Sequence, residues 1–353
     1  MKEKKMTALV FVAPGKVELV EKAVPRPGPT DALIRITTTT ICGTDVHILK
    51  GEYSVRPGLT IGHEPVGVIE ELGAAVKGYQ VGQRVIAGAI TPCGQCGPCL
   101  NGTHSQCGGK PMGGWRFGNT IDGAQAEFLL VPNAAANLAP VPDHLSDEEV
   151  LMCPDIMSTG FSGAESGRVK IGDSVAIFAQ GPIGLCATIG AKLSGASLII
   201  AVDSLEGRLK MSKEVGADVT INYKEKDPVS AILELTQGRG VDVAIEALGT
   251  EATFQSCMRV LKPAGTLSSL GVYAKDIQIP LSAFYAGLGD QKLVTTLCPG
   301  GKERMRRLMD VIYNKRVDLK SMVTHRFKLN QILEAYDLFA NQRDGVLKVA
   351  ISP

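Results

Sequence analysis

The sequence has few histidines and aromatic residues and no excess of either charge. Its 353 residues include five histidines, one tryptophan and 5% aromatic residues, and the formal net charge is +1. Such a balance creates no field that attracts nucleic acid or an acidic membrane surface, so we expect neither as a partner. The five histidines also leave few imidazoles from which to build a metal or proton-transfer site.

The sequence also lacks a long unbroken hydrophobic run. Its longest apolar region, residues 175–202, is interrupted by Gly181, Pro182, Lys192 and Gly195, so it cannot form a continuous membrane helix. The apolar stretch at residues 8–13 is short, and no cleavage pattern follows it. We therefore expect no signal peptide and a cytoplasmic location.

Cysteine is present in an informative pattern. Four cysteines form the spacing CxxCxxCx7C in a loop rich in Gly and Pro: Cys93, Cys96, Cys99 and Cys107. Four thiolates can close a tetrahedral shell around zinc with no open position, which is typical of a structural site. A bacterial ferredoxin run begins in the same way, but its fourth Cys comes sooner and precedes Pro, whereas Gly108 follows Cys107 here. The pattern predicts a structural zinc lobe at residues 93–107 without disulfides.

The length and the texture of the chain indicate two domains. Up to about Pro154, short β-branched runs alternate with Gly and Pro, as in a compact β-rich domain. From about Ser174, strand and helix signals alternate, which predicts a parallel doubly wound sheet. The strands of that sheet are expected at residues 174–179, 198–202, 219–221, 241–247 and 266–270. The fold class is thus α/β, with a Rossmann domain and a second, β-rich domain.

A dinucleotide site is expected where the first of these strands ends. Gly181, Pro182, Ile183 and Gly184 open a helix whose N-terminus can meet a pyrophosphate. Asp203 ends the next strand, close to the ~20 residues expected for a carboxylate that binds ribose hydroxyls. A carboxylate there repels a 2′-phosphate, so NAD is predicted.

Two alternatives remain for this nucleotide site. Asp203 could act only as the N-cap of the helix that begins near Leu205. Arg208, one turn further along, could meet a 2′-phosphate and reverse the preference for NAD.

A second, catalytic metal site is predicted from CGTDVH, which contains Cys42, and GHE, which contains His63. Catalytic zinc takes three protein ligands and leaves a position for water or substrate. Asp155 and Cys153 compete for the third place.

Residues 62–85, GHEPVGVIEELGAAVKGYQVGQRV, closely resemble the zinc signature of the medium-chain alcohol dehydrogenases. CGTD and the four-cysteine lobe fall where that family has them, and the resemblance covers essentially the whole chain. It implies a GroES-like catalytic domain at residues 1–157 and 300–353, and a Rossmann domain at residues 158–299.

Three segments, PDIMSTGFSGAE, GGWRFGN and LCPGG, resemble more narrowly the bacterial secondary-alcohol dehydrogenases. In that subgroup the third zinc ligand is an Asp, which implies Asp155, and one thiolate, one imidazole and one carboxylate also balance the charge of zinc. The clostridial-type members lack the four-cysteine lobe and carry Gly in place of Asp203, matching NADP use. This chain therefore resembles an NAD-using relative with both zincs.

The resemblance also implies roles around the catalytic metal. Thr44 is expected to hydrogen-bond the substrate oxygen, and His47 to pass a proton to solvent through the cofactor ribose, unless it is only a surface histidine. Asp45 is expected to accept from His63, unless it is a solvated turn carboxylate. Glu64 either visits the metal during exchange or only supports the other ligands.

The remaining expected site residues are assigned to the substrate pocket and to the cofactor-binding site. Trp115, Leu297 and Cys298 are assigned to the substrate pocket, although Trp115 could equally be an aromatic core residue. Leu270 and Val272, after the last predicted strand, are assigned to the cofactor.

The sequence thus predicts reversible hydride transfer between small secondary alcohols or ketones and NAD, by a homotetramer with two zincs per subunit. A polyol or threonine-type zinc dehydrogenase is the alternative within enzymes. A nonenzymatic zinc- and nucleotide-binding regulator is the alternative from another class.

Overall fold

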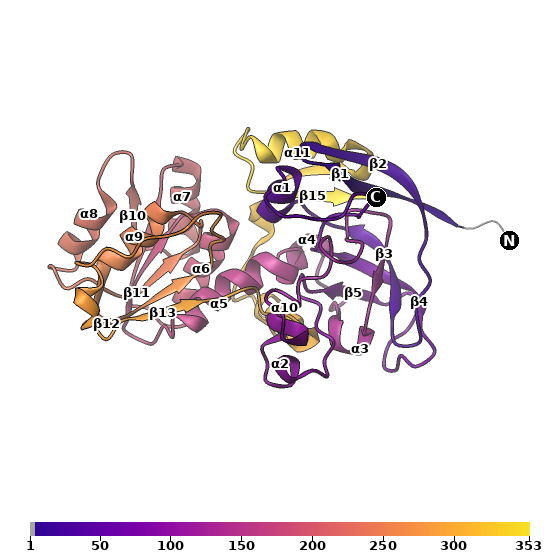
Figure 1. Ribbon diagram of the computed structural model, residues 1–353, viewed down its shortest axis with the longest axis horizontal. Coiled ribbons are helices and arrows are strands. Elements are labelled where there is room, and N and C mark those ends of the chain that lie inside the picture. The colour runs from indigo at the N-terminus through magenta and orange to yellow at the C-terminus, as the bar shows by residue number, and fades with distance from the viewer. Residues whose placement is uncertain (1–3) are drawn as a thin grey trace. The chain divides into compact units, whose positions relative to one another are not determined.

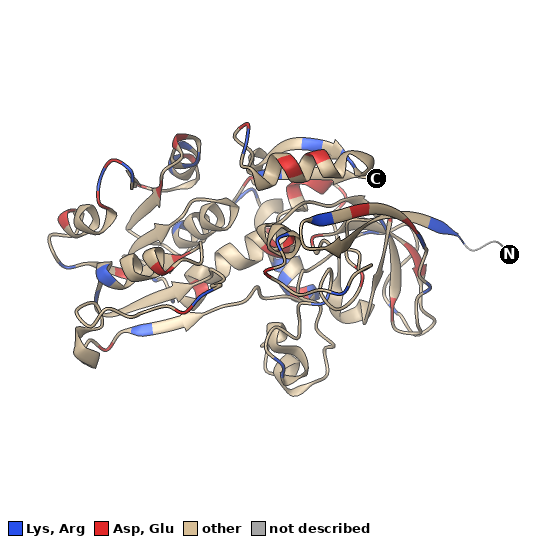
Figure 2. Cartoon of the chain, turned by 45° about the horizontal axis from the view of Figure 1, so that its top comes forward, with Lys and Arg blue, Asp and Glu red and all other residues tan. Residues whose placement is uncertain are grey.

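The computed structural model describes residues 4–353 (Figure 1). The chain divides into two compact units. The first contains the chain up to Ser158 and again from Cys298, and the second contains Thr159–Leu297. Lys and Arg are interspersed with Asp and Glu in both units (Figure 2).

The first unit is built on antiparallel strands. Its five-stranded sheet has the order β6-β3-β4-β5-β7, beside an antiparallel hairpin of β1 and β2 and a parallel pair of β14 and β15. The core of this sheet is apolar and includes Ile34, Ile69 and Phe117. The strands are β1 (Lys5–Ala13), β2 (Lys16–Ala23), β3 (Ala32–Thr38), β4 (Val66–Leu72), β5 (Arg84–Ala87), β6 (Phe128–Val131), β7 (Leu138–Pro140), β14 (Val323–Lys328) and β15 (Lys348–Ser352).

The helices of the first unit are mostly short, and the C-terminal segment returns to this unit. Thr39, just after β3, forms a bridge with Ile351 of β15, and α11 packs on β15 (Figure 1). The helices are α1 (Gly43–Leu49), α2 (Gly97–Leu100), η1 (His104–Gly109), α3 (Ala134–Asn137), α4 (Asp147–Val150), η2 (Cys153–Met157), α10 (Lys302–Tyr313), η4 (Lys320–Met322), η5 (Leu329–Gln331) and α11 (Ile332–Ala340).

The second unit contains the predicted parallel sheet. Six parallel strands have the order β10-β9-β8-β11-β12-β13, in which the order reverses beside β8. This arrangement confirms the α/β fold class, because it is the order of a dinucleotide-binding Rossmann sheet. The elements are α5 (Ser158–Ser166), β8 (Ser174–Phe178), α6 (Pro182–Leu193), β9 (Leu198–Asp203), α7 (Glu206–Val215), β10 (Val219–Asn222), α8 (Pro228–Leu235), β11 (Val241–Glu246), α9 (Glu251–Val260), β12 (Leu261–Ser269), η3 (Tyr285–Gly287) and β13 (Lys292–Thr295).

Element boundaries differ from the sequence-based expectation around α9. The helix begins at Glu251, because the Thr250 side chain caps it by accepting from the Thr253 backbone N–H. β12 then begins at Leu261 rather than at residue 266, so the strand already includes the turn-like run up to Gly265. Polar capping, and not apolar periodicity, sets the start of this helix.

Candidate functional site

The short helix α1 carries the first group of site residues. Cys42 is its N-cap, and the Cys42 backbone N–H donates to Asp45 Oδ2 at 2.9 Å, so the start of the helix fixes the Asp45 carboxylate. Thr44 lies in the first turn, with its hydroxyl oxygen 3.7 Å from Cys42 Sγ. His47 lies in the last turn, is 44% exposed and pairs with Glu52. One helix therefore holds a thiol, a hydroxyl and an imidazole in sequence toward solvent.

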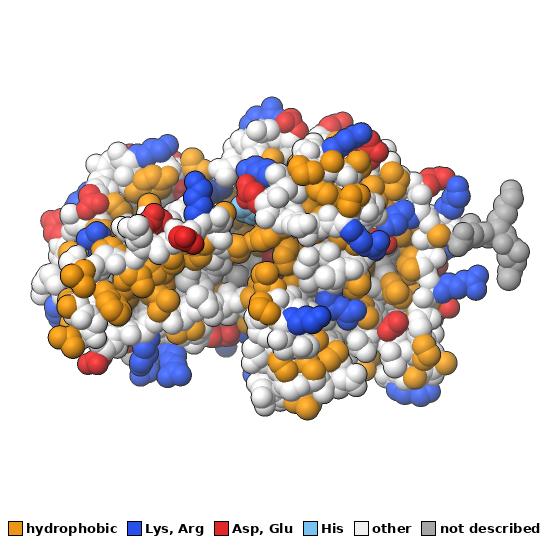
Figure 3. Space-filling view, viewed as in Figure 1, with side chains coloured by type: hydrophobic (Ala, Val, Ile, Leu, Met, Phe, Trp, Pro, Cys, Tyr) orange, Lys and Arg blue, Asp and Glu red, His pale blue; other side chains and the backbone are white. Residues whose placement is uncertain are grey.

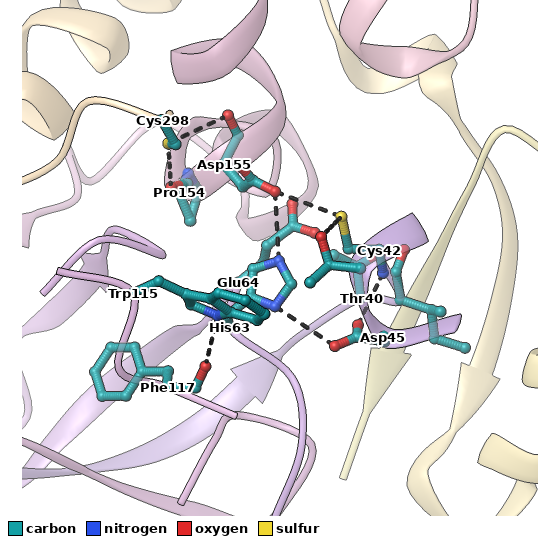
Figure 4. Close-up of polar contacts among 12 residues, drawn as sticks. Thr40, Cys42, Asp45, His63, Glu64, Trp115, Phe117, Pro154, Asp155 and Cys298 are labelled. Atoms are coloured by element: carbon teal, nitrogen blue, oxygen red, sulfur yellow. Dashed lines mark hydrogen bonds and ion pairs between the residues drawn. The ribbon is translucent and has the colours of Figure 1, made fainter. Parts of the chain in front are cut away.

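His63 and Glu64 lie in the loop before β4. The His63 imidazole is buried between two carboxylates, with Nδ1 3.5 Å from Asp45 Oδ1 and Nε2 3.3 Å from Asp155 Oδ2 (Figure 4). Thr39 Oγ1 donates to the backbone oxygen of Glu64 at 3.1 Å, which ties this loop to the end of β3. The loop thus presents two polar side chains to the interior of the first unit.

Asp155 enters the site from η2, a π-helical turn. π-turns are rare in proteins overall, but those that occur are often found at functional sites. Asp155 Oδ2 lies 3.4 Å from Cys42 Sγ, whereas the neighbouring Cys153 Sγ contacts Met157 Sδ at 3.8 Å. Of the two competing residues, the structure brings Asp155 to Cys42 and His63. Ligand atoms of Cys42, His63, Glu64 and Asp155 all lie within 4.8 Å of one another.

The charge of this cluster calls for a cation. Burial raises the pKa of the Cys42 thiol, and so does the Asp155 carboxylate. Burial alone lowers the pKa of His63, but Asp45 and Asp155 outweigh it and leave that pKa well above its usual value. Burial also raises the pKa of Glu64 to about 7, against the opposing effect of Lys348. Burial thus disfavours the ionised forms of Cys42 and Glu64, and a bound cation would restore them.

A divalent metal fits these residues. Within residues 4–353, the buried Glu64 Oε2 has no hydrogen-bond partner, which is a costly arrangement unless a cation or water meets it. A thiolate, an imidazole and carboxylates together form a donor set that suits zinc and leaves room for a further ligand. The fourth residue, Glu64, could act as a further zinc ligand or support the other ligands without binding the metal.

Lys348 of β15 is a site residue that sequence analysis did not identify. Its Nζ donates to Glu64 Oε1 at 2.6 Å and to the Ile41 backbone oxygen at 3.0 Å, and both charged side chains are 1% exposed. A lysine inside the otherwise apolar run of β15 was a usable signal, because a buried charge is almost always paired.

Replacing Lys348 with methionine is expected to lower the midpoint of thermal unfolding. The change leaves Glu64 buried without its partner, and breaking a buried ion pair in this way costs about 3–5 kcal/mol. Differential scanning calorimetry measures the shift. Lys5→Met, which breaks the exposed pair with Glu21, is the control and should leave the midpoint almost unchanged. Equal midpoints for both variants would contradict this account.

An aromatic wall stands beside the metal cluster. The Trp115 ring packs edge-on to Tyr53 at 5.4 Å and to His63 at 6.4 Å between ring centroids, and Tyr53 in turn meets His47 at 5.8 Å. Trp115 Nε1 donates to the Phe117 backbone oxygen at 3.1 Å, which fixes the indole (Figure 4). Trp115 is therefore buried and also borders the site. Tyr53 is a further border residue that no sequence motif indicated.

Cys298 and Leu297 differ in their surroundings. Cys298 is buried, and its Sγ lies 3.8 Å from the Asp155 backbone oxygen, so it supports the turn that carries Asp155. Leu297 is the last residue of the second unit and is partly buried.

The four-cysteine lobe forms a second cluster in the first unit. Cys93 Sγ and Cys99 Sγ lie 4.0 Å apart, as do Cys96 Sγ and Cys107 Sγ. Tetrahedral zinc with Zn–S bonds of about 2.3 Å requires sulfurs about 3.8 Å apart, so this cluster fits a structural zinc. The Gly108 N–H donates to Cys96 Sγ at 3.1 Å and is the main cause that lowers the Cys96 pKa to about 6, which favours the thiolate a metal needs.

The expected nucleotide loop joins β8 to α6 in the second unit. Gly181 is the N-cap of α6, with Pro182 and Ile183 in its first turn. At Gly184 an added Cβ would lie 1.9 Å from the Ala179 backbone oxygen, so only glycine allows this close packing of loop on helix. The exposed N–H groups at the start of α6 form an anion-binding site of the kind that holds a pyrophosphate.

Asp203 ends β9 beside that loop. Its Oδ2 accepts from the Gln180 N–H at 2.7 Å, and its Oδ1 accepts from the Ser204 and Leu205 N–H groups at 2.7 and 3.0 Å. Arg208 Nη1 lies 3.9 Å from Asp203 Oδ2. The carboxylate thus orders the loop, and Arg208 offsets part of its charge.

Leu270 and Val272 follow β12 and differ in exposure. Leu270 is buried in a core cluster with Ile245, so its side chain packs the sheet. Val272 is 50% exposed, and its backbone closely approaches Gly249.

Replacing Ala179 with glycine is expected to raise the midpoint of thermal unfolding. Ala179 has φ +74° in the left-handed region, which costs a non-glycine residue roughly 1–2 kcal/mol, and about half of that gain is lost to glycine's greater freedom when unfolded. Ala176→Gly in the neighbouring strand β8, where no such strain exists, is the control and should lower the midpoint. A fall in the midpoint for both variants would show that the loop is not strained.

Comparison with known proteins supplies the family. Residues 28–143 match the alcohol dehydrogenase GroES-like domain, and residues 182–314 match the zinc-binding dehydrogenase domain. An alcohol dehydrogenase of Cupriavidus necator is 63% identical, over 99% of each chain. An NADP-dependent isopropanol dehydrogenase of Thermoanaerobacter brockii is 37% identical, over 98% of this chain and 99% of its own.

A solved structure agrees with this match. Zinc-dependent alcohol dehydrogenase 2 from Streptococcus pneumonia superposes with a TM-score of 0.91 at 36% identity, covering 98% of both chains. Among residues 4–353, no helix is both long and apolar enough to cross a membrane. From its two matched domains and its full-length relatives, the chain belongs to the zinc-dependent medium-chain alcohol dehydrogenases, enzymes that use zinc and a nicotinamide cofactor.

Proposed function

We propose that this alcohol dehydrogenase interconverts small secondary alcohols and ketones with NAD, at a catalytic zinc held by Cys42, His63 and Asp155. The observation that carries the proposal is the convergence of these three side chains, with Glu64, within 4.8 Å. When bound there, zinc supplies Lewis acidity that makes an alcohol hydroxyl more acidic.

The side chains of α1 can then carry away the proton that the alcohol hydroxyl loses. Thr44, beside Cys42, accepts a hydrogen bond from the substrate hydroxyl and takes up its proton while it gives its own hydroxyl proton to the cofactor ribose, as the C–O bond gains double-bond character. His47 lies one turn further along the same helix, is exposed and is paired with Glu52, so it can pass that proton to solvent. The carbinol hydrogen leaves as a hydride to the nicotinamide ring. The products are the ketone, NADH and one proton.

The aromatic wall supports a small, largely apolar substrate. Trp115 and Tyr53 border the cluster with rings, and a polyol would instead need polar side chains to hold its extra hydroxyls. Relatives of 37% and 35% identity are named NADP-dependent isopropanol dehydrogenases, which agrees with a secondary alcohol. The family assignment to an enzyme sets aside the nonenzymatic regulator.

NAD is favoured over NADP because of Asp203. The buried carboxylate lies at the end of β9, where a ribose is bound in Rossmann folds, and a 2′-phosphate there would meet a negative charge. Arg208 works against this preference, and two relatives named above use NADP. The proposal of NAD therefore depends on the Asp203 carboxylate accepting from the ribose in addition to the backbone N–H groups that it already binds.

We further propose a cytoplasmic homotetramer. Exposed apolar side chains gather in the second unit around β12 and β13 (Figure 3), and they include Leu281, Leu288 and Leu293. Such side chains are typical of a surface covered by another subunit. A reducing cytoplasm would keep as thiols the five cysteines of the two zinc sites.

A substrate panel tests this function. Initial rates of NADH or NADPH formation are compared for 2-propanol, 1-propanol, 2,3-butanediol and threonine. The proposal predicts the highest kcat/KM for 2-propanol with NAD. A higher kcat/KM for the diol or for threonine would replace it with the polyol or threonine-type reaction, and a higher value with NADP would overturn the cofactor assignment.

A further inference from the structure

A buried chain of hydrogen bonds leads from helix α11 to Asp45, whose other carboxylate oxygen lies 3.5 Å from Nδ1 of the candidate zinc ligand His63. The Tyr336 hydroxyl donates to Gln125 Oε1 at 2.8 Å, and Gln125 Nε2 donates to Asp45 Oδ2 at 3.1 Å. Tyr336 is 3% exposed, and Gln125 and Asp45 are 0% and 1% exposed. No local motif links these residues, which lie in α11, in the segment before β6 and in α1.

The partners of Gln125 define which way its amide points. The nitrogen faces two acceptors, the Asp45 carboxylate and the Thr40 backbone oxygen, each at 3.1 Å. The oxygen faces a donor, the Tyr336 hydroxyl. A flipped amide would set an oxygen against a carboxylate and leave the phenol without an acceptor, in a place where water cannot compensate.

This direction is transmitted to the His63 ring. Asp45 Oδ2 is occupied by the Cys42 and Gln125 N–H donors, so Oδ1 is the oxygen that faces His63 Nδ1. At 3.5 Å the two atoms form an ion pair and no hydrogen bond, but a carboxylate held in this place favours a proton on Nδ1, which leaves Nε2 as the ring atom directed at Asp155 (Figure 4). The orientation of the imidazole is thus set by Gln125, which acts through Asp45.

Gln125 also supports the backbone that carries His63. Its N–H donates to the Ile61 oxygen at 2.9 Å, and an added Cβ on Gly62 would lie 2.5 Å from Gln125 Cγ. Gly62 has φ +92°, so the loop turns tightly over the Gln125 side chain. A shift of Gln125 would therefore move both the ring and its main chain.

We propose that Gln125 and Tyr336 are positioning residues that hold His63, through Asp45, in the tautomer and orientation that bind the catalytic zinc. This inference rests on the proposed catalytic zinc site. It assigns to the C-terminal helix α11 a part in metal retention, through the hydrogen bond from the Tyr336 hydroxyl to Gln125.

Zinc release tests the proposal. The zinc-loaded enzyme is mixed with excess chromogenic chelator, and the release phase that is absent from Asp155→Ala reports the catalytic zinc. Gln125→Met removes both polar atoms at nearly constant volume, and Tyr336→Phe removes one hydroxyl. Tyr79→Phe is the matched control, because the Tyr79 hydroxyl donates at 2.8 Å to the Leu138 backbone oxygen and to no site residue.

The expected result is release of the catalytic zinc about 10-fold faster in Gln125→Met, with a smaller increase in Tyr336→Phe. The release of the lobe zinc should stay at the parent rate in both variants and in Tyr79→Phe. Parent-like release of the catalytic zinc from a folded Tyr336→Phe and Gln125→Met would overturn the proposal, as would equal acceleration of both zincs.

Two further measurements separate this role from simple stability and from the proposed function. In an Asp45→Asn background, Gln125→Met should add little further acceleration, because the path to His63 is already broken. Full additivity would count against the path through Asp45. If Gln125→Met does not fold, Tyr336→Phe alone decides. A parent enzyme that holds only the lobe zinc overturns the proposed function itself, and this inference with it.

Discussion

Replacing Asp155 with alanine is expected to remove one of two zincs per chain and to lower kcat/KM for 2-propanol about 1,000-fold or more. Asp155 Oδ2 lies within 3.4 Å of both Cys42 Sγ and His63 Nε2, so its loss opens the shell and removes a negative charge that binds the metal. Loss of Lewis acidity worth several kcal/mol accounts for the size of the effect. Elemental analysis gives the zinc count, and NADH absorbance gives the rate.

Cys153→Ala is the matched control for this prediction. Cys153 lies two residues before Asp155 in the same π-turn and is fully buried, but its Sγ packs against Met157. The variant should keep both zincs and most of the activity. If Cys153→Ala loses a zinc and Asp155→Ala keeps two, the third ligand is the thiol and the present assignment is wrong.

Replacing Asp203 with asparagine is expected to change the cofactor preference. We expect kcat/KM to rise about 10-fold or more with NADP and to fall by a similar factor with NAD. The neutral side chain no longer repels a 2′-phosphate, a term of about 1–4 kcal/mol at contact distance, and Arg208 becomes free to meet the phosphate. Asparagine keeps an oxygen for the Ser204 and Leu205 N–H groups but loses the acceptor of the Gln180 N–H, so the midpoint of thermal unfolding is measured beside the rates.

Glu206→Gln controls for a general loss of negative charge near the nucleotide loop. Glu206 lies in the first turn of α7, three residues after Asp203, and pairs with Asn222. This variant should leave the ratio of NAD to NADP activity unchanged. An Asp203→Asn enzyme with the parental ratio would mean that Asp203 only orders the loop.

Much of the fold and part of the site were predictable because they depend on local patterns. The alternation of strands and helices after Ser174 predicted the parallel sheet, and the sheet order confirms the α/β class. Cys42 and His63 could be predicted as ligands from the CGTD and GHE segments, because neighbouring residues in each segment fix the backbone of the ligand. The spacing of the four cysteines within one loop likewise predicted their zinc site.

Other parts of the site depend on long-range packing. The residues alone left Cys153 and Asp155 open as the third ligand, and the resemblance to the secondary-alcohol dehydrogenases implied Asp155. The folded π-turn that carries both residues places Asp155 beside Cys42. Gln125 and Tyr336 reach Asp45 from segments 80 and more residues away, so no spacing rule reveals them. Of these residues, Lys348 alone had a local sequence signal, because it is a charged residue within an apolar strand.

Removal and return of the catalytic zinc test the central claim most directly. The enzyme is treated with chelator until one zinc per chain remains, and NADH formation from 2-propanol is measured before treatment, after it, and after zinc is restored. We predict that activity is lost with the more weakly held zinc and returns when it is replaced, while the fold persists. Full activity with one zinc per chain, or with none, would contradict a zinc-dependent reaction at Cys42, His63 and Asp155.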